Sequence, residues 1–326
     1  MKFNLGSIRK YSGSTLIVGI FSCLLSSSIL AQKPIERKGA PYVKTSLNAY
    51  SFNELLTAGM QDKSKGMSIF QFLDFSAVNN FDAVDLTGYF FPGYPKVPSD
   101  EFIYSVKKRA FQLGLDISGT GVKNDFANPD PAKRAADVLL VKAWIDVAVK
   151  LGAPVIRVFA GEIPAGYENK RSEVATYMAA SLKECADYGK LRGVLVGVQN
   201  HGDFLQTAEQ CIDMVNRVHS DWFGLIVDTG KFLTTDPYVD IEKTLPYAVN
   251  FQLKESPFGP RSPIKTDLPR LMKIIRNSGY RGYLPIETLQ IKGEPRPVPD
   301  ISYNPYVLVP ILLKDVKAAI KAEYNQ

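Results

Sequence analysis

The sequence predicts a single-domain (β/α)8 barrel, and three observations support this fold class. Short β-branched runs alternate with longer amphipathic segments from about residue 42 onward. Eight such runs occur in about 280 residues, which is typical of a barrel of parallel strands with right-handed crossovers. Several predicted helices end in glycine just before the next strand, as at Gly152 and Gly193. The alternative is an open doubly wound sheet, which usually carries a glycine-rich phosphate turn after its first strand. Residues 48–52 (NAYSF) contain no such turn.

The predicted elements follow one another in regular order. The strands cover residues 44–50, 83–87, 116–119, 155–159, 194–199, 224–228, 249–254 and 283–287. The helices cover residues 68–79, 101–113, 133–151, 172–190, 207–218, 241–245, 268–278 and 305–322.

The first 31 residues have the order of regions found in a secretory signal peptide. A basic start precedes the apolar run at 16–25 (LIVGIFSCLL), and a small-residue segment ends at Ala31. Serines at 26–28 interrupt the apolar run well short of the roughly 20 residues that span a bilayer. We therefore expect cleavage after Ala31 and an exported protein, periplasmic or secreted. A lipid anchor at Cys23 is less favoured, because Phe21 fits a lipobox poorly.

The predicted domains are a signal peptide at 1–31, a leader at 32–41 and the barrel at 42–326. The formal net charge is +6, but the signal peptide carries +3 and the leader a further +2. The barrel is therefore nearly neutral, which argues against nucleic acid as a partner. No later segment is long and apolar enough to span a membrane. The sequence leaves the oligomeric state open, a homo-oligomer included.

Histidine and cysteine are scarce. His201 and His219 are the only histidines, which excludes sites built from several imidazole ligands, such as those of multi-zinc hydrolases. Cys185 and Cys211 are the cysteines that remain after cleavage. We expect them to be buried thiols, although an oxidising compartment would permit a disulfide between them.

Polar residues occur at the carboxyl ends of the predicted strands, where barrel enzymes build their sites. Asp228 and Glu287 are the clearest, because two carboxylates that converge on one mouth require a cation or a proton between them. An oxygen-rich site with little imidazole suits Mn2+ or Mg2+ better than Zn2+. The alternative for these carboxylates is a structural ion pair with Lys254 or Arg157. The other strand-end residues taken as candidates are Asn48, Asp85, Gln199, Asn200, His201, Gln252 and Glu255.

The loop at 89–95 (YFFPGYP) is rich in aromatic residues, proline and glycine. Tyr89 and Phe91 could offer flat surfaces to the apolar faces of sugar rings. The equally weighted alternative is that they stiffen the loop and cap the barrel. Together with Asn48, Asp85 and Arg157, they make up the predicted substrate-binding set.

Four segments occur in an order that resembles strands five to eight of the xylose isomerase-like TIM barrel family, also called the sugar phosphate isomerase/epimerase family. They are GVQNHG at 197–202, VDTGKF at 227–232, FQLKE at 251–255 and RGYLPIE at 281–287. The resemblance implies a divalent metal held by a Glu, an Asp, a His or Gln, and a Glu on successive strands. By position these ligands fall on Gln199, Asp228, Gln252 and Glu287.

Gln199 departs from this pattern, because an amide replaces a carboxylate and cannot take a proton at neutral pH. A symmetrical two-carboxylate epimerisation is therefore disfavoured, and Gln199→Glu should tighten metal binding. The remaining mechanism uses Glu287 as the base next to a carbonyl, with the metal polarising the carbonyl oxygen. His201 would act as the acid or base partner, and the equally weighted alternative is that it only holds neighbouring groups by hydrogen bonds. Lys254 would neutralise the developing oxyanion or hold a hydroxyl group.

Three hypotheses follow for an exported protein whose partner is a small carbohydrate. The first is a metal-assisted isomerase or hydratase/dehydratase (a hydro-lyase) acting on a keto-sugar. The second is an epimerase in which His201 replaces the missing carboxylate. The third is a carbohydrate-binding barrel that has lost its metal and its catalysis. The chain has no glycine-rich phosphate nest, so we expect a non-phosphorylated sugar.

Overall fold

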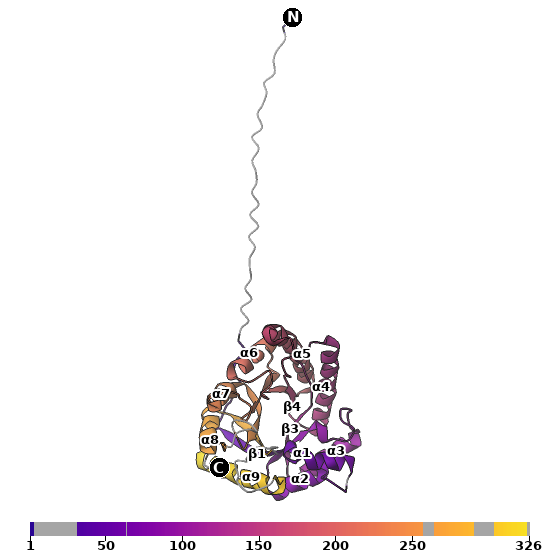
Figure 1. The fold of residues 1–326 in the computed structure, drawn as a ribbon, viewed down its shortest axis with the longest axis vertical. Coiled ribbons are helices and arrows are strands. Elements are labelled where there is room, and N and C mark those ends of the chain that lie inside the picture. The colour runs from indigo at the N-terminus through magenta and orange to yellow at the C-terminus, as the bar shows by residue number, and fades with distance from the viewer. Residues whose placement is uncertain (3–30, 63, 257–263, 290–302, 325–326) are drawn as a thin grey trace. The chain divides into compact units, whose positions relative to one another are not determined.

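A computed structural model gives the structure of the protein and describes residues 1–2, 31–62, 64–256, 264–289 and 303–324. The predicted signal peptide, with Cys23, therefore lies almost entirely outside the described residues. Residues 31–326 form one compact unit, in which a ring of helices surrounds the strands (Figure 1). None of the described helices is both long enough and apolar enough to cross a membrane.

Each of the eight predicted strand runs forms a strand. They are β1 (Tyr42–Asn48), β2 (Ala83–Thr87), β3 (Asp116–Gly121), β4 (Val155–Phe159), β5 (Leu195–Gln199), β6 (Phe223–Asp228), β7 (Ala248–Lys254) and β8 (Arg281–Glu287). Only β1 and β3 end at a residue other than the predicted one, each differing by two positions. The carboxyl ends, which carry the candidate site, are therefore where the sequence places them.

The helices are α1 (Asn53–Gln61), α2 (Ile69–Val78), α3 (Asp100–Gln112), α4 (Pro131–Leu151), α5 (Arg171–Arg192), α6 (Ala208–Val218), α7 (Pro237–Thr244), α8 (Leu268–Asn277) and α9 (Pro305–Tyr324). The sequence did not predict α1, a short helix of nine residues that buries only Leu56 and Gly59. The helices α4 and α7 begin earlier than predicted. In each, an aspartate, Asp130 or Asp236, caps the first turn and a proline follows it.

The eight strands form a closed parallel barrel in sequence order. Strand β1 pairs with β8 from Tyr42 opposite Arg281 to Leu47 opposite Ile286, so the sheet has no free edge. This closure confirms the predicted barrel over the open doubly wound sheet. At the carboxyl ends the register sets three pairs side by side: Asn48 with Asp85, Asp228 with Gln252, and Lys254 with Glu287.

Apolar side chains fill the layer between strands and helices, and Trp144 of α4 is the largest fully buried one. The inside of the barrel is partly polar. The hydroxyls of Ser46 and Ser118 lie 2.8 Å apart, and Asn250 donates to the Ser118 carbonyl at 3.1 Å. These groups satisfy one another in pairs, as buried polar atoms must. A polar layer therefore underlies the mouth.

The predicted leader packs against the amino-terminal end of the barrel. The Gln32 side-chain amide donates to the carbonyl of Phe223 at 3.3 Å, and its oxygen accepts from Ser220 N–H at 3.1 Å. The Arg37 guanidinium donates to the carbonyl of Ala248. Phe223 and Ala248 begin β6 and β7, so the leader covers the end of the barrel opposite the mouth.

Cys185 and Cys211 are both free and buried, as predicted. Cys185 lies in α5 and Cys211 in α6, and burial raises the pKa of each thiol. They pack as small apolar residues and stay protonated at neutral pH.

Candidate active site

The predicted polar residues meet inside the mouth of the barrel. Eight strand-end side chains belong to residues that are each less than 9% exposed: Asn48, Asp85, Arg157, Gln199, Asp228, Gln252, Lys254 and Glu287. They come from β1, β2, β4, β5, β6, β7 and β8. Burying so many polar groups costs free energy unless they form hydrogen bonds or ion pairs with one another. The way in which they pair therefore defines the site.

An ion-paired triad lies at the centre of the site. The Lys254 ammonium contacts Oε1 of Glu287, and it lies 3.6 Å from Oδ2 of Asp228. The three side chains are 7%, 6% and 0% exposed, respectively. The ion pair with Lys254, which the sequence left as the alternative to a metal, is therefore present. One ammonium group serves two carboxylates that would otherwise repel each other.

The Asp228 carboxylate is held from several directions. Its Oδ2 accepts a hydrogen bond from Gln199 Nε2 at 2.6 Å, and its Oδ1 accepts one from the Gly230 N–H at 3.0 Å. The Asn200 side chain binds both the N–H and the carbonyl of Asp228, at 2.8 and 2.9 Å. The amide at Gln199 thus acts as a hydrogen-bond donor to the carboxylate, a role that a glutamate could not fill at neutral pH.

The Lys254 side chain has a fitted path to the carboxylates. Its backbone N–H donates to the Thr229 hydroxyl at 2.9 Å, and its carbonyl accepts from the Thr266 hydroxyl at 2.7 Å. A Cβ at Gly230 would lie 2.7 Å from Lys254 Cγ, so only glycine leaves room for the stem. The position of the ammonium group is therefore built into the fold.

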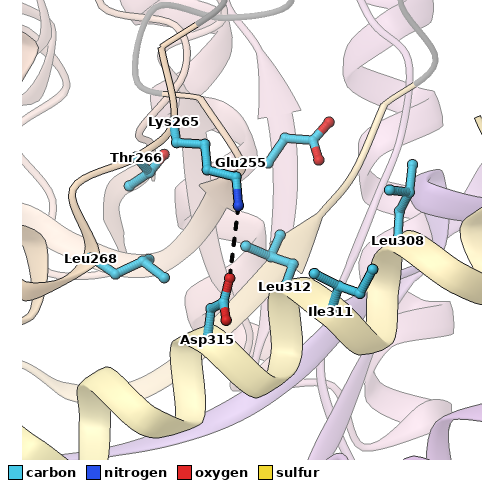
Figure 2. Close-up of a pocket in the computed structure, with 8 residues that line it drawn as sticks. All are labelled: Glu255, Lys265, Thr266, Leu268, Leu308, Ile311, Leu312 and Asp315. Atoms are coloured by element: carbon cyan, nitrogen blue, oxygen red, sulfur yellow. Dashed lines mark ion pairs between the residues drawn. The ribbon is translucent and has the colours of Figure 1, made fainter. Parts of the chain in front are cut away.

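Glu255, the residue after Lys254, points away from the mouth of the barrel. Glu255 lines a small pocket with Lys265, Thr266 and the apolar side chains of α9, as Figure 2 shows. Lys265 pairs there with Asp315 of α9 at 3.9 Å. Alternation along the chain thus sends Lys254 into the mouth and Glu255 to the outer layer.

Burial and charge act in opposite directions on the triad. Burial lowers the pKa of Lys254, but Asp228 and Glu287 together outweigh burial and raise it above the ordinary value. Burial also raises the pKa of Glu287, against the influence of Lys254. The lysine is charged at neutral pH, and the buried glutamate is a stronger base than a solvent-exposed one.

The four expected metal ligands lie on successive strands, but their arrangement does not fit a divalent ion. Asp228 accepts from Gln199, and Glu287 accepts from Lys254. The Gln252 oxygen accepts a hydrogen bond from Asn48 Nδ2. Across the part of the chain that the structure describes, no three His, Cys, Asp or Glu side chains are grouped so as to hold a metal. The oxygens that a cation would need are turned toward donors of the protein itself.

Asp85 is a further buried carboxyl group, on the opposite side of the barrel from the triad's strands β6 and β7. Burial raises its pKa to about 7, opposed by Arg157 and assisted by Glu287. Asn250 Nδ2 lies 3.5 Å from its Oδ2, and Gly119 leaves the space that the carboxyl group fills. Asp85 therefore exists in both protonation states near neutral pH.

Asp85→Asn is expected to raise stability at neutral and higher pH. The pKa of Asp85 is higher in the folded protein than its ordinary 3.8, so its contribution to stability is present below about pH 4 and lost as the pH rises through about 7. The advantage of the asparagine should grow over this window and level off at up to about 4 kcal/mol. Thermal unfolding across the window measures it, with Asp221→Asn, at an exposed carboxylate, as the control. A difference that does not vary with pH would contradict the assignment.

Arg157 binds the loop after β2. Its guanidinium donates to the carbonyl of Val122 at 2.6 Å and to the Tyr89 hydroxyl at 2.7 Å. It also lies 4.0 Å from the centre of the Phe159 ring. Burial raises the pKa of Tyr89 to about 12, against the influence of Arg157. Arg157 and Tyr89, two of the five predicted substrate-binding residues, thus form one hydrogen-bonded unit.

His201 follows β5 and packs against the Phe159 ring, with ring centres 4.6 Å apart. Burial lowers its pKa to about 3, helped by the charges of Lys231, Lys254 and Arg157. Burial and these three charges therefore oppose the acid or base role predicted for His201 from its ordinary pKa. At neutral pH the ring is uncharged, with one N–H donor and one acceptor nitrogen.

Phe91 lies outside the site, contrary to its prediction as a sugar-binding residue. It is fully buried, and its ring packs edge-on against Phe102 of α3 and Trp144 of α4. The loop turns this ring toward the helices, so it caps the barrel core. Tyr94 from the same loop also packs on Trp144, which supports the capping alternative for this part of the loop.

Two residues near the site were missed from the sequence. Asn250 lies two positions before Gln252 on β7, so strand alternation places it on the same face, one layer deeper. Lys231 follows β6 and lies beside Gly202, where its charge acts on His201. Alternation could have found Asn250, whereas no periodic signal marks a loop residue such as Lys231.

Comparisons with known proteins agree with the barrel fold. The family model described as "Xylose isomerase-like TIM barrel" matches residues 73–301. A D-psicose 3-epimerase structure determined in the presence of D-fructose is 16% identical, with a TM-score of 0.66 over 87% of this chain and 100% of that one. The D-psicose 3-epimerase of Clostridium cellulolyticum H10 with D-tagatose is also 16% identical, with a TM-score of 0.65 over 86% and 98%.

An L-ribulose 3-epimerase is 16% identical as well, with a TM-score of 0.67 over 86% of this chain and 96% of that one. At this identity the three structures share the fold with the chain. A search of curated proteins finds no match. The family match covers well over half of the chain, and the barrel closes as the family requires. The chain belongs to the xylose isomerase-like TIM barrel family.

Proposed function

We propose that the protein is an exported enzyme that transfers a proton on the carbon next to the carbonyl group of a non-phosphorylated keto-sugar. The observation that carries this proposal is the buried triad of Glu287, Lys254 and Asp228 at the mouth of the barrel. It combines a carboxylate base with a fixed positive charge, the two groups that enolisation needs. The similar solved structures, described as ketose 3-epimerases, support a sugar as the substrate.

Glu287 is the base in this proposal. Its carboxylate ends β8 and is buried, which raises its pKa toward the range in which a general base works best. Lys254 is in contact with it and can donate an N–H to the oxygen of the developing enediolate. The metal-assisted form of the mechanism is not carried forward, because the donor oxygens at the mouth do not fit a divalent ion.

Isomerisation is favoured over epimerisation with His201 as second base. An epimerase needs a proton acceptor on each face of the substrate carbon, and a histidine whose pKa is about 3 is a poor acceptor at neutral pH. A neutral imidazole can still donate a hydrogen bond to a sugar oxygen. A hydratase/dehydratase reaction begins with the same proton abstraction and shares the base.

The pairing of the cations supports a sugar without a phosphate group. The charge of Lys254 is offset by two carboxylates, and Arg157 is bound to Val122 and Tyr89, so neither offers the unpaired positive charge that would favour a phosphate dianion. Hydroxyl groups of a sugar can instead bind the amides of Asn48 and Gln252 and the Asp85 carboxyl group. Export is supported by the residue pattern at 1–31 and by the compact unit that begins at Ala31.

Exchange of carbon-bound hydrogen with solvent tests the proposal. The purified protein is incubated in D2O with D-fructose, D-psicose and D-tagatose, and the sugars are followed by proton NMR and mass spectrometry. Deuterium is expected at a carbon next to the carbonyl of at least one sugar, faster than with protein denatured beforehand. A keto-sugar bound by the folded protein without any exchange would support the binding-only alternative and overturn the proposal.

A further inference from the structure

We propose that the Lys254 ammonium group takes the place of a divalent ion in this barrel, so that the site is complete without a metal. The inference deepens the proposed function and rests on it for its catalytic meaning. The geometry that supports it, and the metal-binding test, do not depend on catalysis.

The first support is the position of the ammonium group. It lies between the carboxylates of β6 and β8, in contact with Glu287 and 3.6 Å from Asp228. A divalent ion bound to the same two carboxylates would have to displace it. Displacement would separate a buried lysine, whose side chain is 7% exposed, from both of its carboxylate partners. Leaving that charge unpaired in the interior would cost several times what a surface lysine would lose.

The second support is the path built for the lysine side chain. Thr229 and Thr266 hold the backbone of Lys254 on both sides, and Gly230 leaves the space through which its stem passes. The two threonines fix the backbone at position 254, and Gly230 leaves the room in which Cγ of the lysine lies.

The third support is the state of the other donors. Gln199 points an N–H at Asp228, and Asn48 points an N–H at the Gln252 oxygen. Around a metal ion these oxygens would face the cation. Here the amides complete a hydrogen-bonded network whose one positive centre, among the residues that contact Asp228 and Glu287 in the described chain, is Lys254.

The net charge of the site is consistent with replacement of the divalent ion by Lys254. In the pattern implied by the family resemblance, three carboxylates surround a divalent ion and leave one net negative charge. In this chain Gln199 removes one carboxylate and Lys254 supplies a single positive charge, so one net negative charge remains. The two differences from the pattern compensate each other. An ammonium group also donates three N–H bonds; among the described residues two acceptors engage it, and the third can bind a substrate oxygen.

The test measures metal binding, with no reference to turnover. Wild-type protein is analysed for bound metals and titrated with Mn2+, followed by calorimetry, electron paramagnetic resonance and thermal unfolding. We expect no stoichiometric metal, no saturable binding up to about 1 mM Mn2+ and no change in Tm on adding Mn2+ or a chelator. One tightly bound divalent ion per wild-type chain would overturn the inference.

The matching gain-of-function variant combines Lys254→Met with Gln199→Glu. It removes the ammonium group and restores a third carboxylate, so it should bind one Mn2+ at least about 100-fold more tightly than wild type does. Lys231→Met with Gln199→Glu is the control, because it removes a neighbouring lysine and leaves the triad intact. A folded Lys254 variant that binds no Mn2+ would also overturn the inference. If the variant fails to fold, the wild-type titration still decides.

The outcomes separate this inference from the proposed function. Metal-free wild type that exchanges no sugar hydrogen would leave the lysine assignment standing and end the proposed catalysis. Wild-type protein that binds Mn2+ and exchanges sugar hydrogen would overturn the lysine assignment and leave the proposed catalysis standing.

Discussion

Glu287→Gln is expected to lower the rate of hydrogen exchange into the keto-sugar by about 10²- to 10⁴-fold, the usual contribution of a general base. The amide keeps the shape of the side chain but cannot accept a proton. Lys254 retains Asp228 as a partner at 3.6 Å, so the fold should persist. The loss should appear in kcat, with little change in KM, because the amide still binds the sugar oxygens.

Asp240→Asn is the matched control for this result. Asp240 is also a buried carboxylate, but it accepts hydrogen bonds from the Ala208 N–H and the Thr234 hydroxyl, away from the mouth. Its variant should lose stability and keep the exchange rate per folded molecule. Exchange by Glu287→Gln within about two-fold of wild type would show that another group is the base.

The sequence could predict the frame of the site because each strand end is marked by local patterns. Short apolar runs before Asp228 and Glu287, and glycine at helix ends such as Gly152 and Gly193, give the period of the barrel. Once the barrel is assumed, parallel strands bring their last residues to one mouth. The polar residues of this mouth therefore follow from the fold class and the strand boundaries alone.

The pairing inside the mouth could not be predicted in the same way. Both a metal and a lysine ion pair satisfy two converging carboxylates, and the choice depends on distances of a few ångströms across the barrel. Those distances are set by strand register and by the room at Gly230, which join residues from β6, β7 and β8. The neutral state of His201 depends on its burial and on the charge of Lys231. The spacing of apolar residues in the sequence predicts neither of these.

The aromatic loop at 89–95 shows that composition alone cannot predict which way a loop side chain points. Tyr89 and Phe91 are two positions apart in one loop, yet the Tyr89 hydroxyl reaches Arg157 and the Phe91 ring packs on Trp144. Their composition is equally suited to binding a sugar and to capping a core. Only the path of the backbone after β2 decides which ring faces the mouth, and this path is fixed by contacts with α3 and α4.

Lys254→Met is expected to be the most destabilising substitution at the mouth, by about 3–5 kcal/mol at neutral pH. It leaves two buried carboxylates facing each other without a cation, and it removes the charge that lowers the pKa of Glu287 against burial and the repulsion of Asp228. A raised pKa in the folded state destabilises the fold at high pH, and this penalty is lost as the pH falls and the carboxyl groups take up protons. Urea unfolding at about pH 8 and about pH 5 measures both the penalty and its recovery.

A double variant distinguishes lost charge pairing from lost packing. Adding Glu287→Gln to Lys254→Met removes one of the stranded charges, so the double variant should be more stable than Lys254→Met alone at about pH 8. Lys142→Met, which breaks the exposed ion pair with Glu184 between α4 and α5, should cost less than about 1 kcal/mol. If Lys254→Met were as stable as wild type at high pH, the ammonium group would not be neutralising the carboxylates. A recovery by the double variant, in contrast, would show that the charge of Lys254, and not the bulk of its side chain, holds Asp228 and Glu287 together at the mouth of the barrel.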